Sequence, residues 1–396
     1  MIESYKNKSI LYMTSVDISK NNGPGVNERE FINYLAKIVN KNVHFIIPSP
    51  QFELPDEIPL ELCIFTYQHN TRNIVKWLLH QISIIKCFHL IVAKQKFDYI
   101  VIRKGIFPFG YCYIAKKTKI PYVMKHAGNG KFNIFKEKNF AIKSLYFLNK
   151  KLFYYLLKKS KVADVVSESE KKSLLNIYGK NIKVEVVDNG VNINKFIPKS
   201  TQLAKHSLNL QKYFPIIGYA GNLPWERGAM QIIQALPELI ESYPQIRSLI
   251  LGDGDKMHIL YDKAKELQVL EYCIFTGNVE YDKVVDYINC MDITVSIRYE
   301  DTQDASELKV RQYLACGRPV IVSPGSNDFV ADEDVGFVVD PYSIDEFINA
   351  SKKLLNLDKD TYSQLSERAR LLAVNQLSYE SKVIEKLKIW EKYTSN

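Results

Sequence analysis

The sequence predicts an α/β protein of two doubly wound domains, each with a parallel sheet between layers of helices. Three observations lead to this prediction. The chain has 396 residues, more than one hydrophobic core usually supports. Short apolar runs alternate with segments of helical periodicity, which is typical of parallel sheets covered on both faces. The composition, with 46% hydrophobic and 24% charged residues, is globular and excludes the disordered and fibrous classes.

The first half of the chain opens with a strand, a turn and a helix. The strand is the apolar run Ser9–Thr14, and the turn is the Gly- and Pro-containing segment 21–25. A helix is predicted over Asn27–Asn40, where apolar residues recur at helical spacing. Three further apolar runs predict strands: Val43–Ile47, Phe97–Ile102 and Pro121–Lys125.

The second half repeats this alternation. The turn sequence Asp188–Gly190 separates the halves, so we expect domains of residues 1–188 and 189–378. A helix is predicted over Ala229–Tyr243, and an amphipathic helix over Tyr379–Tyr393 near the C-terminus. The predicted strands are Pro215–Ala220, Ser248–Leu251, Tyr272–Thr276, Ile293–Ile297 and Pro319–Ser323.

The residues that follow the strands form the candidate site, because sheets of this kind bind ligands at the carboxyl ends of their strands. Gly23 and Gly25 open a helix, where a backbone can approach an anion. His126 follows a strand, and Arg227 stands near a helix start and suits a phosphate. The alternatives are a plain tight turn, a structural histidine and a surface arginine. We expect the two domains to face one another across a cleft.

The segment 304–321 is the most informative. A helix is predicted to begin at an N-cap, Ser306, and to end at Gly317 before a strand. The backbone amides from Ser306 to Lys309 would point into the cleft as an anion site. Gln312 lies two turns into this helix.

The cysteines and the acidic pairs do not predict a metal site. The six cysteines lack Cys-x-x-Cys spacing and lie among apolar neighbours, which is typical of buried free thiols in a reducing cytoplasm. Asp253 and Asp255 form an Asp-x-Asp pair, but their place between a strand and a helix favours a turn with an N-cap.

The sequence also lacks evident targeting and membrane-spanning segments. The N-terminal residues 1–6 do not form the apolar core of a signal peptide. The apolar run Phe88–Ala93 is far shorter than the roughly 18 residues that span a bilayer. We therefore expect a cytoplasmic protein.

The charge is distributed unevenly. Residues 1–200 contain 32 basic and 15 acidic residues, a net charge of +17, and the remaining 21 basic and 29 acidic residues give −8. Segment 101–161 holds 15 basic residues and one acid, Glu137. Such a block indicates an anionic partner, and a solvated lysine-rich surface is the alternative.

In this order and spacing, the segments resemble glycosyltransferase family 4, whose members are retaining nucleotide-sugar transferases of the GT-B fold. The resemblance covers about residues 10–345. It implies an acceptor-binding N-terminal domain, a donor-binding C-terminal domain, and a C-terminal helix, 379–396, that crosses back onto the first. The segments that carry it are Ala163–Ser169, Val184–Pro198, Gly218–Gly228, Leu251–Gly254 and Leu308–Ile321.

The resemblance also implies roles for particular residues. Gly23 and Gly25 would face the donor phosphates, His126 would contact the transferred sugar, and Arg227 would hold the diphosphate. The expected catalytic residues are His126, Asp304 and Arg227. The expected donor-binding residues are Gly23, Gly25, Gly221, Asn222, Arg227, Arg298, Ser306, Glu307, Leu308, Lys309 and Gln312.

Three positions depart from the family pattern. Asp304 and Gln312 replace the two glutamates of the family's Glu-x7-Glu motif, which hold the sugar and the ribose. Glutamine loses a charge-assisted bond worth about 1–2 kcal/mol. Asn222 replaces a diphosphate-binding arginine, and Arg298 or Lys309 could supply the missing charge.

The mechanism implied by the resemblance is same-face attack by the acceptor, with the departing phosphate taking the acceptor's proton. Arg227, Lys309 and the helix amides beginning at Ser306 would stabilise the negative charge on the leaving group. No protein nucleophile is evident, and no metal or other cofactor is expected besides the nucleotide-sugar substrate.

The acceptor, a glycan or a lipid-linked sugar, is expected to dock on the N-terminal domain. Segments 132–140 and 144–159 interleave lysines with aromatic residues, as an interfacial helix on an anionic membrane does. The alternative is a core helix with solvated lysines. The protein would then be peripheral on the inner face of the cell membrane. No nucleic-acid module is present, so no nucleic-acid partner is expected.

Two other functions remain open at this point. Gln312 and Asn222 also suit a non-catalytic partner subunit that keeps the fold. A nucleotide-sugar epimerase or phosphorylase of the same fold is the other alternative.

Overall fold

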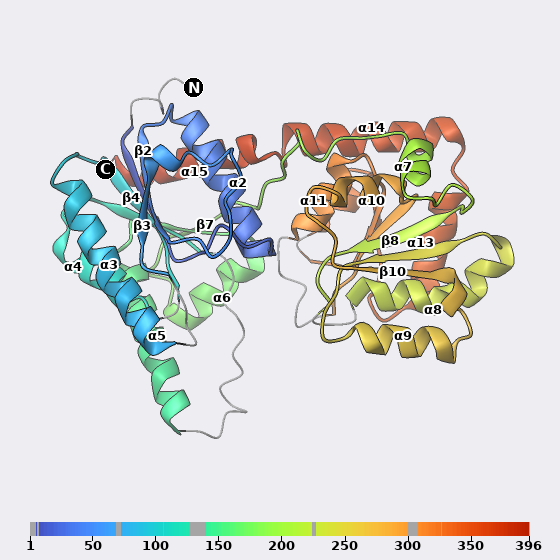
Figure 1. Ribbon diagram of the computed structural model, residues 1–396, viewed down its shortest axis with the longest axis horizontal. Helices are drawn as coiled ribbons and strands as arrows, with labels where there is room; N and C mark the ends of the chain where they lie inside the picture. Colours follow the sequence, from blue (N-terminus) through green and yellow to red (C-terminus); the bar gives the residue numbers. More distant parts are fainter. Residues whose placement is uncertain are drawn as a thin grey trace. The chain divides into compact units, whose positions relative to one another are not determined.

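The computed structural model divides the chain into two compact units (Figure 1). Unit 1 comprises Met1–Gly190 and Tyr379–Asn396, and unit 2 comprises Val191–Ser378. Each unit contains one parallel sheet with helices on both faces, which confirms the predicted α/β class with two doubly wound domains. The structure describes residues 5, 8–68, 73–105, 107–126, 140–223, 227–299, 307–325 and 327–395.

The sheet of unit 1 has the strand order β3-β2-β1-β4-β5-β6-β7, all parallel, in the described part of the chain. Its strands are β1 (Ile10–Thr14), β2 (Val43–Pro48), β3 (Cys63–Thr66), β4 (Tyr99–Arg103), β5 (Tyr122–Lys125), β6 (Ala163–Val165) and β7 (Val184–Val186). Its helices are α2 (Gly23–Ile38), the 3₁₀ turn η1 (Leu60–Leu62), α3 (Ile74–Val92), α4 (Phe109–Lys117), α5 (Phe140–Lys159), α6 (Glu168–Tyr178) and α15 (Tyr379–Thr394).

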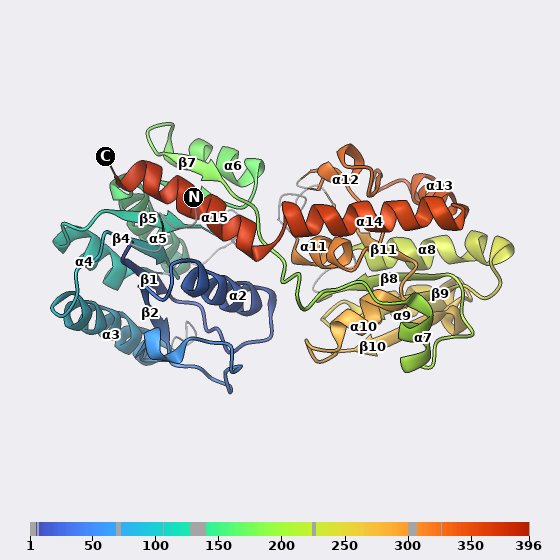
Figure 2. The same cartoon turned by 90° about the horizontal axis from the view of Figure 1, so that it is seen from above.

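Helices α2 and α15 cover one face of this sheet, and α3, α4 and α5 cover the other (Figures 1 and 2). Each face has its own hydrophobic cluster. Successive side chains of a strand point to opposite faces. Accordingly, Ile10 and Tyr12 of β1 pack in the cluster with α2 and α15, whereas Leu11 and Met13 pack with α3, α4 and α5. All five residues of β1 are buried because it is a central strand.

The sheet of unit 2 has the order β10-β9-β8-β11-β12-β13 among the described residues. Its strands are β8 (Ile216–Ala220), β9 (Arg247–Leu251), β10 (Cys273–Gly277), β11 (Ile293–Ser296), β12 (Val320–Val322) and β13 (Gly336–Val338). Its helices are α7 (Thr201–Ser207), α8 (Arg227–Ser242), α9 (Met257–Glu266), the 3₁₀ turn η2 (Leu270–Tyr272), α10 (Val284–Cys290), α11 (Leu308–Ala315), α12 (Phe329–Asp332), α13 (Ile344–Leu355) and α14 (Lys359–Asn375).

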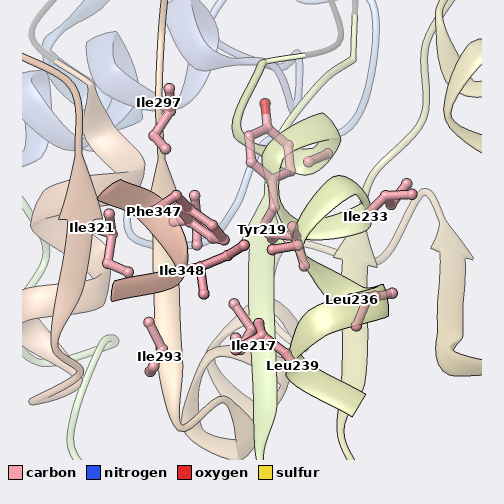
Figure 3. Close-up of a cluster of buried hydrophobic side chains, with 14 of the residues drawn as sticks. Ile217, Tyr219, Ile233, Leu236, Leu239, Ile293, Ile297, Ile321, Phe347 and Ile348 are labelled. Carbon is pink, nitrogen blue, oxygen red and sulfur yellow. The ribbon is translucent and has the colours of Figure 1, made fainter. Parts of the chain in front are cut away.

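The largest cluster of unit 2 joins β8 and β11 to α8 and α13 (Figure 3). Ile217 and Tyr219 of β8 contact the aliphatic side chains of α8 and Phe347 of α13. The ring of Tyr219 lies on this cluster, and its hydroxyl points away from it (Figure 3). A buried ring with a polar tip at the end of a strand is suited to holding a neighbouring polar group.

The C-terminal helix α15 belongs to unit 1. Val383, Leu387 and Trp390 are fully buried in the cluster formed with α2. The Trp390 indole donates a hydrogen bond to Asp164 Oδ1 at 2.8 Å, and the Lys386 ammonium pairs with the other oxygen of Asp164. This helix is thereby anchored to β6 by polar contacts as well as to the core by its apolar face.

Three predicted helix starts are corrected by the structure. Helix α2 begins at Gly23 instead of Asn27, because the Asn22 side chain caps it by accepting from Gly25 N at 3.0 Å. Helix α11 begins at Leu308 with Glu307 at the N-cap position, and the predicted N-cap, Ser306, lies outside the described residues. The N-cap position of α9 is Lys256, not either aspartate of the Asp-x-Asp pair.

The structure also corrects the predicted burial of the cysteines and the predicted length of the apolar segment that contains Phe88. All six cysteines are free thiols, but only Cys87, Cys290 and Cys316 are buried and the others are half-buried. In the described part of the chain, one helix, α3, is long and apolar enough to cross a membrane, with mean hydropathy 1.3 over Val75–Val92 and 28% of that window buried. The run Phe88–Ala93 covers only the end of this helix, since α3 begins at Ile74 and includes polar residues such as Gln81 and Lys86.

Candidate functional site

The carboxyl ends of β8 and β9 in unit 2 come close together through two glycines. Gly221 and Gly252 follow these strands with φ angles of +148° and +123°, a backbone region that disfavours other residues. A Cβ atom on Gly221 would lie 3.1 Å from Lys309 Nζ, and one on Gly252 would overlap the carbonyl of Gly221. Glycine at 221 therefore lets the Lys309 side chain lie against the backbone at the end of β8.

Tyr219 orients Lys309 at this edge. The Lys309 ammonium donates to the Tyr219 hydroxyl at 2.8 Å and lies 3.9 Å from the centroid of its ring. The hydroxyl in turn donates to the carbonyl of Asn222 at 3.1 Å. A cation held over an aromatic face keeps its charge available to an anionic ligand.

A buried carboxylate, Glu307, joins the two cations of this edge. It accepts a hydrogen bond from the Ser296 hydroxyl, and its Oε1 lies 3.5 Å from Arg298 and 3.8 Å from Lys309. Because one negative charge faces two positive ones, Glu307, Arg298 and Lys309 together carry a net charge of +1. The Glu307 carboxylate therefore lies inward and positions Arg298 and Lys309, which sequence reasoning did not anticipate.

A polar hollow lies at the carboxyl ends of β8, β9 and β10 in the same unit. Its volume is about 540 Å³. It shares Asn222 with the cationic group, so a ligand could contact both. Its lining residues are Asn222, Asp253, Gly254, Asp255 and Asn278.

In unit 1, His126 follows β5 and is held on two sides. Its ring stacks on Phe153 with centroids 5.0 Å apart, and its Nε2 lies 3.3 Å from Glu170 Oε1. The other Glu170 oxygen accepts from Val166 N, which fixes the carboxylate at the start of α6. A carboxylate beside a histidine at a strand end is an arrangement that can hold or move a proton.

A buried ionic network occupies the carboxyl ends of β1, β4 and β5. Glu28 of α2, fully buried, accepts from the Tyr12 hydroxyl at 2.7 Å and from Lys125 at 2.9 Å, and it pairs with Arg103. Burial alone raises the pKa of Glu28, but the charges of Arg103 and Lys125 outweigh it and hold this pKa at about 2. Burial lowers the pKa of Lys125 to about 7 against the attraction of Glu28.

The glycines of the first loop have distinct environments. A Cβ atom on Gly25 would overlap the Lys20 carbonyl, so this glycine is required by the packing of the turn before α2. A Cβ atom on Gly23 would meet nothing within 4 Å. Packing around the turn therefore does not require glycine at position 23.

Several predicted residues lie together, and others lie outside the described structure. Gly221, Asn222, Arg298, Glu307 and Lys309 meet at one edge of unit 2. Leu308 and Gln312 lie half-buried on α11 beside them. Asp304 and Ser306 lie outside the described residues, as does the side chain of Arg227, the first residue of α8.

The site residues that sequence reasoning missed are Tyr219, Ser296, Glu170 and Glu28. Tyr219 is one residue before the strand-end Ala220, and its inward-facing ring gives no polar signal in the sequence. Glu170 is three residues after a helix N-cap, Ser167, a spacing that reads as a capping pattern and not as a histidine partner.

The family profile described as Glycosyl transferases group 1 matches residues 200–372, which lie in unit 2. The chain is 24% identical over 222 residues to a lipopolysaccharide 1,2-N-acetylglucosaminetransferase of Salmonella typhimurium, covering 52% of this chain and 57% of that protein. It is 22% identical over 172 residues to an alpha-monoglucosyldiacylglycerol synthase of Streptococcus pneumoniae, covering 42% and 38%. The alignments thus span less than two thirds of these relatives.

Solved structures share the fold over almost the whole chain. The sucrose-phosphate synthase of Thermosynechococcus elongatus superposes with a TM-score of 0.73 and 16% identity, covering 98% of this chain and all of that one. The Anabaena protein Alr3699/HepE, solved in complex with UDP and glucose, gives 0.71 and 13% identity and covers 97% and 99%. The chain therefore has the GT-B fold, and its residues 200–372 are similar to the glycosyl transferases of group 1.

Proposed function

We propose that the protein is a retaining glycosyltransferase of family 4 type that transfers a sugar from a nucleoside diphosphate sugar to a glycan or lipid-linked acceptor. The observation that carries this proposal is Lys309, held by Tyr219 and Glu307 at the strand ends of the unit that matches group 1 glycosyl transferases. One matched relative is named as an N-acetylglucosaminetransferase and another as a monoglucosyldiacylglycerol synthase, so a non-catalytic subunit, an epimerase or a phosphorylase is not favoured.

The chemistry proposed for unit 2 is stabilisation of the leaving diphosphate. Lys309 and Arg298, with a net charge of +1 after Glu307, would face the negative charge that develops as the C1–oxygen bond breaks. The amides at the start of α11 and Arg227 at the start of α8 would add to this field. Because these groups supply the positive charge, we propose a reaction that needs no metal.

The remaining predicted residues complete the proposed site. Asp304 would hold the transferred sugar and Gln312 the ribose. Gly23 would let the donor phosphates approach the backbone of the first loop. His126, oriented by Glu170, would contact the sugar at the reacting carbon.

The acceptor side of the proposal concerns unit 1. One matched relative is named for lipopolysaccharide and another for a diacylglycerol glycolipid. Together with the net charge of +17 in residues 1–200, these names support an acceptor in cell-surface polysaccharide or glycoconjugate assembly. We propose a cytoplasmic protein that acts peripherally at the inner face of the cell membrane.

A two-step experiment tests this function. Thermal-shift measurements with UDP-, GDP- and ADP-sugars should show that one nucleotide stabilises the protein, because a ligand at 100 times its dissociation constant adds about 2.7 kcal/mol. The stabilising donor is then incubated with lipid-linked and soluble glycan acceptors, and the anomeric configuration of the product is read by NMR. Failure of every nucleotide sugar to stabilise the protein would contradict the proposal, and an inverted product would contradict the retaining mechanism.

Restoring the family residue at position 312 provides a sharper test of the ribose contact. We expect Gln312→Glu to keep the nucleotide affinity or to raise it by up to about tenfold, because a carboxylate makes charge-assisted bonds to hydroxyls. Calorimetry measures this, with Gln364→Glu on the exposed face of α14 as the control of equal charge change. A large loss of affinity in Gln312→Glu alone would mean that the site selects the neutral amide.

A further inference from the structure

Helix α3 carries an apolar stripe on its solvent-facing side. We name as the α3 stripe the five exposed residues Val75, Leu78, Leu79, Ile82 and Leu90. At 100° per residue they fall within about one third of the helix circumference and extend over about 22 Å. Val75 and Leu90 at its ends are 60% and 64% exposed. A soluble surface helix normally places polar residues there.

The opposite side of α3 is packed in the core of unit 1. Ile84, Phe88 and Ile91 are buried in the same cluster as Leu11 and Met13 of β1. Removing α3 from this layer to cross a bilayer would expose that core to water. The length and hydropathy of α3 therefore fit a helix that lies along a surface better than one that spans a membrane.

The apolar surface continues onto the two neighbouring helices. Helix α4 contacts α3 through the ring pairs Trp77–Phe109 and His89–Tyr113, and it contacts α5 through Cys112 Sγ and the carbonyl of Leu152. These helices also expose large apolar side chains: Phe109 and Tyr113 on α4, and Phe147, Leu148 and Tyr154 on α5. An extended exposed apolar surface marks an interaction site.

The charge of this three-helix layer has one sign. Helices α3, α4 and α5 contain nine lysines and no aspartate or glutamate. By contrast, α2 and α15 on the other face of the sheet carry both acidic and basic residues. The exposed lysines of the layer are Lys86, Lys116, Lys117, Lys151, Lys158 and Lys159. Lys86 lies within the arc of the α3 stripe, where its aliphatic stem can lie on apolar surface while its ammonium stays at the polar boundary.

We propose that the layer formed by α3, α4 and α5 docks on an anionic lipid bilayer, with the α3 stripe inserted at the level of the headgroups and the surrounding lysines on the anionic lipids. An apolar stripe on a layer of helices that contain lysines and no acidic residue is complementary to such a surface. A second copy of the chain is a poorer partner, because a two-fold dimer would place lysines against lysines. The inference rests on the proposed function only in naming this surface as the side of unit 1 that meets a membrane acceptor.

Cosedimentation with vesicles tests the proposal without any sugar donor or acceptor. The full chain should pellet with phosphatidylcholine–phosphatidylglycerol vesicles at about 0.1 M salt, and much less with phosphatidylcholine alone or at about 1 M salt, where the Debye length falls from about 10 to about 3 Å. The stripe variant Leu78→Ser/Ile82→Ser/Leu90→Ser should bind at least about tenfold more weakly. The lysine variant Lys151→Glu/Lys158→Glu/Lys159→Glu should bind at least about 100-fold more weakly, since each lysine contributes about fivefold.

Two controls test whether vesicle binding depends on the α3–α5 layer in particular or on any exposed apolar residue or lysine. Leu203→Ser/Leu371→Ser removes exposed apolar residues of unit 2, and Lys388→Glu/Lys392→Glu reverses exposed lysines on α15. Both controls should bind vesicles like the unmodified chain. Melting curves of all variants should coincide with that of the unmodified chain, because every changed side chain is exposed.

The outcomes that would overturn the proposal are distinct from failure of the proposed function. The proposal fails if the unmodified chain stays in the supernatant at low salt, or if the stripe variant binds vesicles as well as the unmodified chain does. It also fails if the control Lys388→Glu/Lys392→Glu loses as much binding as the lysine variant. A dimer in light scattering that the stripe variant dissociates, with no vesicle binding, would assign the surface to self-association. Cosedimentation requires no nucleotide sugar. A chain that binds the vesicles but binds no nucleotide sugar would therefore contradict only the proposed function.

Discussion

Lys309→Met is expected to weaken nucleoside diphosphate binding by about 10- to 100-fold, which corresponds to the 1.5–3 kcal/mol of a charged hydrogen bond. Methionine keeps an unbranched apolar side chain as far as Cε, so it can still contact Tyr219, but it lacks the ammonium that lies 3.9 Å from the Tyr219 ring centroid. Glu307 keeps Ser296 and Arg298 as partners, so the fold of unit 2 should be retained. Calorimetry with the nucleotide that stabilises the unmodified chain measures the change.

A second lysine of the same unit provides the control for this variant. Lys352 forms an ion pair with Glu238 at 2.6 Å on the surface of unit 2, away from the carboxyl ends of the strands. Lys352→Met removes the same charge from the unit and should leave nucleotide affinity unchanged. Equal affinities of Lys309→Met and the unmodified chain would exclude Lys309 from the donor site, and equal losses in both variants would indicate only a general charge effect.

Glu28→Gln should be the most destabilising of the substitutions considered, by about 3–5 kcal/mol, because it leaves the buried Arg103 guanidinium without its anion and removes the charge that favours protonated Lys125. Arg103 and Lys125 both pair with this carboxylate in the core of unit 1. Glutamine has nearly the same volume, so the effect reports the lost charge and not a cavity. Urea denaturation followed by circular dichroism measures the free energy of unfolding.

The pH dependence of this effect has a definite sign. The pKa of Glu28 is about 2 in the folded protein, compared with the ordinary value of 4.5 for a glutamate. Between pH 2 and pH 4.5 the unfolded chain therefore binds more protons than the folded one. The carboxylate therefore stabilises the fold fully above pH 4.5, and this contribution is lost as the pH falls through 4.5 toward 2. The difference in stability between the unmodified chain and Glu28→Gln should shrink in the same window.

Two further variants show whether the network is responsible. Glu61→Gln breaks an exposed pair with Lys41 and should change stability little. Arg103→Met in the Glu28→Gln background removes the unpaired guanidinium and should recover part of the lost stability. If Glu28→Gln unfolds at the same urea concentration as the unmodified chain, the network does not hold the unit together.

The strands were predictable from the sequence because each is a short apolar run bounded by turn residues, and parallel pairing in the interior requires little else. Pro215–Ala220 and β8 differ by one residue, and Ile293–Ile297 and β11 by one. Short strands such as β6 and β13, with three residues each, were not predicted because so few residues carry no periodicity. Helix starts were also misjudged, because a cap depends on which side chain reaches which amide.

The sequence by itself determined the two-sheet α/β class, the segments at the strand ends and the positions at which glycine, histidine and lysine could meet a ligand, because these depend on local periodicity and chain order. Only the tertiary structure decided which of them act together. Tyr219 reaches Lys309 across 90 positions, Glu28 reaches Lys125 across 97, and the α3 stripe faces solvent although its residues look like core. Such pairings and exposures depend on how strands and helices pack, and no local pattern of residues records that packing.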